Sequence, residues 1–137
     1  MGDAHFVTDL LPGLARAHLA RGDWERADEL SARSVMSART NHNHQALSAS
    51  LRVRGMVLTR QGRWEEAQRS FDEALAVARA MPMPRDEAQA LSEYGRMHVL
   101  QGRTEQGRER LQAALALFQQ LGARLDAQRT EQALAAL

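Results

Sequence analysis

The 137-residue sequence contains no cysteine, which excludes disulfides, thiol catalysis and thiolate metal sites and fits a reducing compartment. It has only three prolines and 4% aromatic residues, so few positions interrupt a helix. The apolar fraction of 44% is carried mostly by alanine and leucine, which favour helices packed through small side chains. The predicted fold class is therefore all-α.

Long apolar runs are also missing. No stretch approaches the roughly 20 apolar residues that span a bilayer, so we expect a cytoplasmic protein without a membrane partner. Eighteen basic and seventeen acidic residues leave a net charge of +1, which argues against direct binding of nucleic acid. Lysine is absent, and the arginines that replace it favour fixed, bidentate contacts with carboxylates.

A long repeat organises the chain. Gly22, Gly62 and Gly102 recur at one constant interval of about 40 residues, each within a similar segment. The same interval relates small and apolar residues around each glycine, and their spacing is that of one buried helix face. We predict that these side chains stack from unit to unit and bury one continuous apolar strip. The predicted core positions are Leu11, Ala15, Gly22, Ala27, Leu51, Gly55, Gly62, Ala67, Phe71, Ala74, Leu91, Gly95, Gly102, Leu111 and Ala114.

Each unit is predicted to be a helix, a glycine turn and a second helix. The glycine can take the left-handed conformation that ends the first helix, and Glu25, Glu65 or Glu105 follows in the next first turn, where the helix dipole favours an acid. The expected helices cover residues 8–21, 23–40, 44–61, 63–80, 85–101, 103–121 and 124–136.

This pattern resembles the tetratricopeptide repeat family, whose unit is a helical hairpin with small residues at fixed positions. The second unit carries the resemblance best, through Gly55, Gly62, Trp64, Ala67, Phe71, Ala74 and Leu75. The resemblance implies an α-solenoid of three hairpins and a C-terminal helix, about seven helices in all, with right-handed superhelical stacking. We expect a single repeat domain, residues 1–137, with units near 8–41, 42–82 and 83–122 and a final helix at 123–137.

Four positions depart from the family pattern. Ser31 and Ser34 replace a bulky apolar residue and an alanine in the first unit, and Gly107 replaces an alanine in the third. Arg54 stands where the family usually has leucine. We expect the first unit to be looser and Arg54 to need an acidic partner.

The final helix allows two interpretations. It can be a cap on the third hairpin or the first helix of a longer array that has been cut. Its apolar residues, Leu125, Ala133, Leu134 and Leu137, are more numerous than a solvated cap requires. Homodimerisation through the ends of the solenoid, and through Leu134 in particular, is therefore an alternative.

The period is longer than the family's usual ~34 residues. Together with the segment Ala114–Arg124, it resembles the repeat arrays of large bacterial LuxR-type transcriptional regulators, in which such arrays sense or transmit signals. The sequence contains neither a phosphate-binding loop nor a separate helix-turn-helix, so any role in a regulator follows from the family resemblance alone.

No constellation for catalysis, metal or cofactor binding emerges. His18 and His98 share one register in the first helices and are expected to pack there. His42 and His44 form a pair in a linker, expected to be exposed, and a metal would need a third ligand. His5 lies near the N-terminus. No serine lies in a motif that would make it a nucleophile, so we predict a protein that is not an enzyme.

The resemblance places a ligand on the concave face, which the first helices line. The residues expected there are Asp9, Arg16, Arg52, Met56, Thr59, Gln89, Ser92, Arg96, Val99 and Arg129. Its arginines favour an acidic protein or peptide, although solvation alone would also explain them. We predict a non-enzymatic interaction module. The alternatives are a sensor of a small molecule or signalling peptide and a homo-oligomerisation domain.

Overall fold

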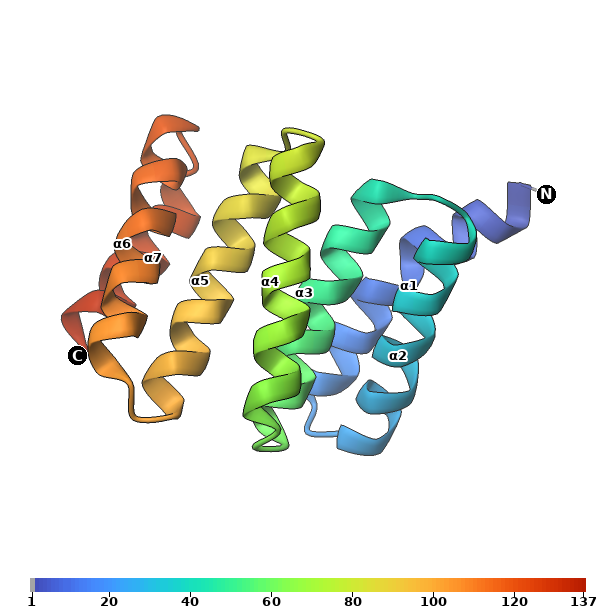
Figure 1. Ribbon diagram of the computed structural model, residues 1–137, viewed down its shortest axis with the longest axis horizontal. Helices are drawn as coiled ribbons and strands as arrows, with labels where there is room; N and C mark the ends of the chain where they lie inside the picture. The colour runs from blue at the N-terminus through green and yellow to red at the C-terminus, as the bar shows by residue number, and fades with distance from the viewer. Residues whose placement is uncertain (1) are drawn as a thin grey trace.

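The computed structural model describes the backbone of residues 2–137 and the side chains from Val7 onward, so the His5 side chain lies outside the described part. This part of the chain forms seven α-helices and no strand (Figure 1). The all-α class and the helical repeat solenoid are therefore confirmed. The helices are α1 (Gly2–Ala20), α2 (Trp24–Thr40), α3 (His44–Arg60), α4 (Trp64–Ala80), α5 (Pro84–Leu100), α6 (Thr104–Gln120) and α7 (Arg124–Ala135).

The helices form two layers. In Figure 1 the second helices α2, α4 and α6 face the viewer, and the first helices lie behind them. The units follow one another along the long axis, with α1 and α2 at one end and α6 and α7 at the other. Successive first helices touch directly, α1 with α3 and α3 with α5, so the first helices share one face of the molecule. None of the described helices is both long and apolar enough to cross a membrane.

Within each unit, a three-residue turn with glycine at its centre joins the two helices. Gly22, Gly62 and Gly102 have positive φ angles of 77°, 71° and 88°, which confirms the predicted left-handed conformation. The residue after each glycine donates its N–H to a carbonyl five residues earlier, for example from Arg63 to Leu58 at 3.0 Å. This bond satisfies a carbonyl that the end of the helix would leave free.

The turns between units close in the same way with different residues. His42 and Gly122 also have positive φ, at 52° and 69°. Pro82 cannot adopt that conformation and has no N–H, yet Met83 still donates to the carbonyl of Ala78 at 2.8 Å. The same turn geometry therefore follows each helix from α1 to α6, whereas the sequence repeat recurs only once for each pair of helices.

The predicted boundaries agree with the structure to within one residue for α2 to α7. The prediction for α1 was wrong at its start, because this helix begins at residue 2 rather than 8. Pro12 lies inside α1 without ending it, and the helix gives up one backbone hydrogen bond there.

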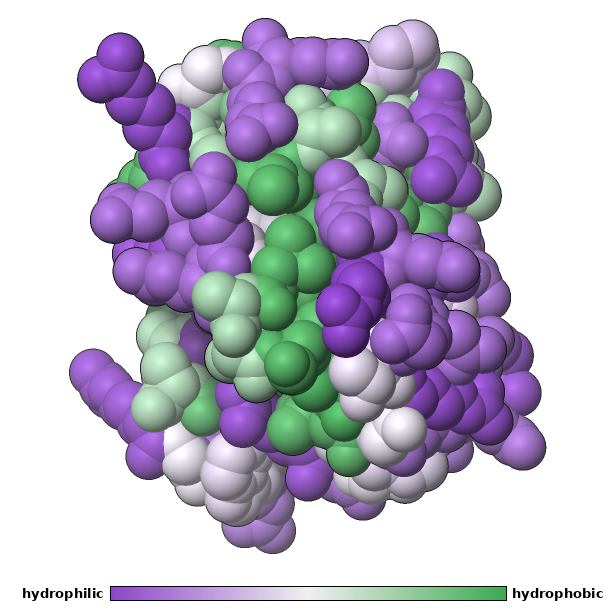
Figure 2. Space-filling model, turned by 90° about the vertical axis from the view of Figure 1, so that its left-hand side faces the viewer, coloured by the Kyte–Doolittle hydropathy of each residue, from purple (hydrophilic) through white to green (hydrophobic). Residues whose placement is uncertain are grey.

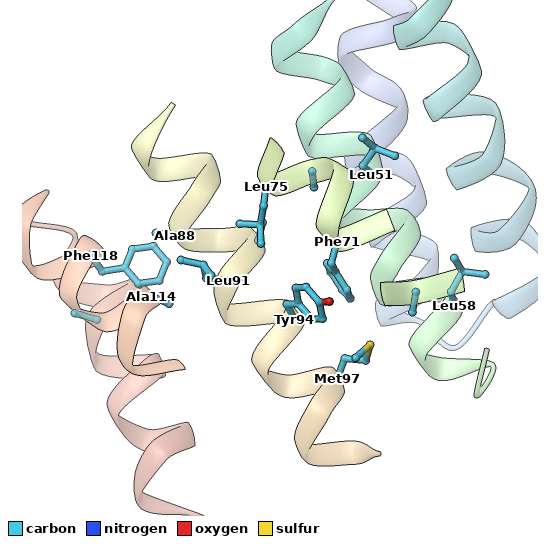
Figure 3. Packing of buried hydrophobic residues seen from close by; sticks show 14 residues of the cluster. Leu51, Leu58, Phe71, Leu75, Ala88, Leu91, Tyr94, Met97, Ala114 and Phe118 are labelled. Carbon is cyan, nitrogen blue, oxygen red and sulfur yellow. The ribbon is translucent and has the colours of Figure 1, made fainter. Parts of the chain in front are cut away.

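The largest part of the core joins α3 to α7. Phe71, Leu75, Leu91, Tyr94 and Met97 meet there with at most 4% of their surface exposed (Figure 3). The Phe71 and Tyr94 rings stack with their centroids 5.2 Å apart. A side chain at Gly55 would collide with the Phe71 ring at 2.6 Å, which explains the small residue at this crossing.

Between the first two units the predicted apolar strip is divided among separate clusters of buried residues. Leu11 is as deeply buried as Leu51 and Leu91, but it belongs to a separate small cluster with Ala15, Leu30 and Val53. A third cluster is also local to the first unit and α3. Met56 packs against both the third cluster and the large one, and polar side chains lie beside them at the α2–α3 interface.

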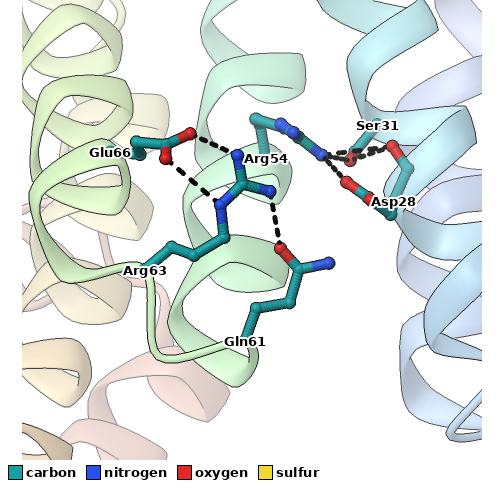
Figure 4. A network of polar contacts seen from close by, with 6 residues as sticks. All are labelled: Asp28, Ser31, Arg54, Gln61, Arg63 and Glu66. Atoms are coloured by element: carbon teal, nitrogen blue, oxygen red, sulfur yellow. Dashed lines mark hydrogen bonds and ion pairs between the residues drawn. The ribbon is translucent and has the colours of Figure 1, made fainter.

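The polar side chains at this interface satisfy one another. Arg54 of α3 forms an ion pair with Asp28 of α2 and donates to the Ser31 hydroxyl at 3.0 Å and the Asp28 carbonyl at 3.1 Å (Figure 4). Ser34 and Ser50, both fully buried, hydrogen bond to each other across the same two helices. The expectation that Arg54 needs an acidic partner is confirmed.

A close approach of α5 and α6 explains the glycine of the third unit. A Cβ atom at Gly107 would lie 2.6 Å from a methyl group of Val99 and 2.8 Å from the Gly95 carbonyl oxygen. Ala27 and Ala67 occupy the same register in the other units, where there is room for a methyl group. The departure at Gly107 therefore lets two backbones touch.

Candidate functional site

Two adjoining cavities lie along the first helices. The polar cavity, of about 80 Å³, draws residues from α1, α3, α5, α6 and α7. The apolar cavity, of about 360 Å³, lies next to it, and Glu93 and Arg96 line both. The polar cavity is lined by Arg16, Arg52, Gln89, Ser92, Glu93, Arg96, Phe118, Asp126, Arg129 and Thr130. The apolar cavity is lined by Met56, Thr59, Arg60, Glu93, Arg96, Met97, Val99, Leu100, Leu111, Ala133, Ala136 and Leu137. We call the two together the groove.

The structure brings nine of the ten predicted binding residues together in this groove. The polar cavity contains Arg16, Arg52, Gln89, Ser92 and Arg129, and Arg96 lines both cavities. The apolar cavity contains Met56, Thr59 and Val99. Asp9 does not line either cavity; its carboxylate accepts a hydrogen bond from the Asn43 side chain at 2.9 Å.

The half-buried arginines differ in whether another side chain contacts them. Arg54 pairs with Asp28, Arg108 lies 3.5 Å from Glu105, and Arg110 donates to His98 and stacks over Tyr94. Arg52 and Arg96 are also half-buried, but neither makes a hydrogen bond or ion pair with any described residue. A guanidinium that has lost part of its hydration gains from a nearby opposite charge, so both groove arginines favour an incoming anion.

The electrostatics at Arg52 reflect this burial. Loss of water lowers the pKa of Arg52 below its usual value, and the nearby charge of Arg16 acts in the same direction. The carboxylates of Glu93, Asp86 and Asp126 oppose this shift but do not cancel it. An additional carboxylate in the polar cavity would restore the ordinary environment of a guanidinium.

Sequence reasoning missed the acidic and several apolar members of the groove. Glu93 and Asp126 stand among four arginines of the polar cavity, and Asp126 lies 3.8 Å from Arg85. Helical spacing could have identified Glu93, since it lies three residues before Arg96 on one face of α5. Met97 was missed because it is buried, whereas Leu100 and Leu137 are exposed and are recognised as members of the groove only from the walls of the cavity.

A third cavity, of about 450 Å³, opens between α2, α3 and α4. Its principal charges already have partners, because Arg39 makes a bidentate contact with Glu73 at 2.5 and 2.7 Å. It therefore presents less unsatisfied charge than the groove.

The described histidines, His18, His42, His44 and His98, lie outside the groove. His98 is 3% exposed, stacks on Tyr94 and accepts a hydrogen bond from Arg110, and burial together with Arg110 lowers its pKa. His18 differs from the expected packing residue, because it is half-buried and its Nδ1 lies 3.1 Å from Asp23. His42 and His44 are exposed. Among the described residues, no group of three potential metal ligands comes together.

The comparisons with known proteins agree with this architecture. No curated protein matches the chain. The sequence model of the tetratricopeptide repeat family matches residues 7–80, which is more than half of the chain and covers most of the first hairpin and all of the second. The matched segment holds Gly55, Gly62, Ala67 and Phe71, the residues that build the second hairpin around its glycine turn. The chain therefore belongs to the tetratricopeptide repeat family.

Proposed function

We propose that the chain is a non-enzymatic repeat domain that binds an acidic segment of a partner protein in the groove. Tetratricopeptide repeats generally mediate interactions between proteins. The observation that carries the proposal is the pair of half-buried arginines, Arg52 and Arg96, which no described carboxylate contacts. A partner carboxylate would supply the missing charge through charge-assisted hydrogen bonds.

The experiment compares acid-rich fluorescent peptides with matched peptides in which every Asp and Glu becomes Asn and Gln. The protein variants are Arg52→Glu and Arg96→Glu, and the control is Arg33→Glu on the exposed side of α2. We expect each groove variant to weaken acid-dependent binding about tenfold or more, because hydrogen bonds to charged groups contribute that much. Circular dichroism should show unchanged helicity. Equal affinity in wild-type protein and both groove variants would refute the groove assignment.

A regulatory setting is the finer form of this proposal. The 40-residue period and the segment Ala114–Arg124 are similar to arrays of bacterial LuxR-type regulators, so the module would be the interaction or sensory part of such a protein. In the sensor version, a bound small molecule or signalling peptide changes the curvature of the array. Small-angle scattering with and without ligand tests this version, since it requires a ligand-dependent change in the radius of gyration.

Exposed apolar ends favour self-association as a second candidate. Leu10 and Leu14 of α1 are 48% and 49% exposed, and they lie one period before Ser50 and Arg54, through which α3 contacts α2. At the other end, Figure 2 shows an apolar strip between hydrophilic side chains over α6 and α7. Large apolar side chains exposed in this part of the chain are Leu121, Leu125 and Leu137.

Sedimentation at micromolar protein concentration tests this second candidate. A dimer that becomes monomeric in Leu10→Glu or Leu125→Glu would support it, and a monomeric wild-type protein would refute it. Leu134, which the sequence suggested for this role, is a poorer target because it is half-buried. Its substitution would also perturb the packing of α7.

A further inference from the structure

The groove joins two chemically different chambers. Four guanidinium groups line the polar cavity, with the Glu93 and Asp126 carboxylates and hydroxyl and amide side chains beside them. The apolar cavity is more than four times larger and has Met56, Met97, Leu100 and Leu111 in its walls. Because Glu93 and Arg96 belong to both, a single ligand could reach from one chamber into the other.

The size of the apolar cavity indicates what it can hold. A volume of about 360 Å³ lies within the range of ordinary ligand sites and exceeds a bulky aliphatic or aromatic side chain. Leu100 is 59% exposed at its rim, so its surface is in contact with water when the groove is empty. An apolar side chain entering the cavity would remove this surface from water.

The helices that line both chambers set the distance between them. On α3, Arg52 lines the polar cavity and Met56 the apolar cavity, and on α7 the corresponding pair is Arg129 and Ala133; in both cases four residues of helix rise about 6 Å. In an extended strand, side chains two positions apart share one face and lie about 7 Å apart. The two distances agree.

We infer that the groove selects an extended peptide in which an acidic residue and a bulky apolar residue stand two positions apart. The carboxylate meets Arg52 and Arg96, and the apolar side chain enters the cavity beside Leu100. This inference rests on the proposed function and adds to it a second recognition element and a spacing. Charge alone would attract any acidic segment, whereas the pair of chambers distinguishes among acidic segments.

The test uses short fluorescent peptides with a Gly/Ser background that contain one Asp and one Leu, two positions apart in either order. The comparison peptides carry Leu→Ala, Asp→Asn, or the same two residues side by side. We expect the better of the two orders to bind about tenfold more tightly than its Leu→Ala or side-by-side version, as burial of one leucine side chain predicts.

Matched protein variants locate the apolar contact. Leu100→Gln changes the cavity rim, and Leu125→Gln changes a leucine of equal exposure, 59%, outside the groove. The peptide substitution Leu→Ala should lose most of its effect in Leu100→Gln protein and keep it in Leu125→Gln protein. A full effect in both variants would overturn the inferred contact.

The outcomes separate the inference from the proposed function. Acid-dependent binding that ignores the leucine or its spacing would overturn the inference and leave the acidic groove intact. Binding that ignores Asp→Asn and Arg52→Glu would refute both. Octanoate, which has a carboxylate and an apolar tail without a peptide backbone, should not displace the peptide at micromolar concentration. Displacement in that range would assign the groove to small amphipathic acids and overturn the choice of a peptide.

Discussion

The α2–α3 and α4–α5 interfaces occupy equivalent places in the solenoid and solve the same packing problem with opposite chemistry. At the first, Arg54 hydrogen bonds to Ser31. At the second, Tyr94 stacks on Phe71, and these two residues lie one period after Arg54 and Ser31. One backbone arrangement thus accepts a polar or an apolar pair, provided that both members change together.

A second pair of positions shows the same matched exchange. Ser34 and Ser50 hydrogen bond to each other at the α2–α3 interface. Ala74 and Ala90, one period later, are both fully buried in the apolar cluster at the α4–α5 interface. A hydroxyl on one side alone would leave a buried polar group without a partner, which explains why the exchange involves both positions.

The largest expected effect on stability comes from removing one ring of the Phe71–Tyr94 pair. Phe71→Ala should lower the free energy of unfolding by about 3–5 kcal/mol, because it removes a fully buried ring from a core that joins two units. The matched variant Ser31→Ala should cost only about 1 kcal/mol, the value of an ordinary hydrogen bond. Urea denaturation measures both. Equal losses would show that the α2–α3 and α4–α5 interfaces contribute alike to stability and would contradict the difference between them.

A smaller effect is expected from the ion pair. Asp28→Ala should cost about 1–2 kcal/mol, a modest value because the Asp28 side chain is 40% exposed although that of Arg54 is only 17% exposed. In the background of Arg54→Leu the same substitution should cost close to zero. A double-mutant cycle measured by urea denaturation gives the coupling. The idea of a matched polar pair fails if the two costs are the same.

Acid should weaken the α2–α3 interface selectively. The hydrogen bond from Arg54 holds the pKa of Asp28 below its ordinary value of 3.8, so this carboxylate stabilises the fold above that pH. The contribution is lost as the pH falls through the lowered pKa. Asp28→Asn should therefore show a smaller loss of unfolding free energy than wild-type protein between pH 5 and pH 3. Parallel curves for the two proteins would contradict the assignment.

The smallest effect is expected from exchanging both serines. Ser34→Ala alone should cost about 1 kcal/mol, because it leaves the buried Ser50 hydroxyl without its partner. Adding Ser50→Ala should recover most of that loss and reproduce the Ala74 and Ala90 arrangement. Thermal unfolding of the three variants compares them directly. A double variant weaker than the single one would mean that other contacts hold the serines in place.

Much of the fold could be predicted from the repeat. The boundaries of α2 to α7 follow from turns that recur at fixed intervals, and only the start of α1 lacked such a mark. The sequence identified Ser31, Arg54 and Gly107 as departures, but it could not show that Ser31 and Arg54 contact each other. That contact joins different helices, and the reason for Gly107 depends on the distance between two backbones.

The groove could be predicted only in part, because its contacts also join residues of different helices. Helical periodicity places Arg52 and Arg96 on one face, and the structure brings them to adjoining cavities. Helical periodicity does not reveal which arginines form ion pairs. Arg54, two residues from Arg52, pairs with Asp28, whereas Arg52 pairs with no described residue. Partner choice depends on which neighbouring helix each face meets.

The matched interfaces also fix the order in which units can follow one another. Duplicating the second hairpin in tandem would keep every turn in phase but would set a copy of Arg54 against Phe71, where Gln68 takes the place of Asp28. Duplicating the third hairpin would set a copy of Tyr94 against Leu111, an apolar neighbour. Hairpins of identical backbone are therefore not interchangeable, because the side chains at each junction pack well against some neighbouring hairpins and poorly against others.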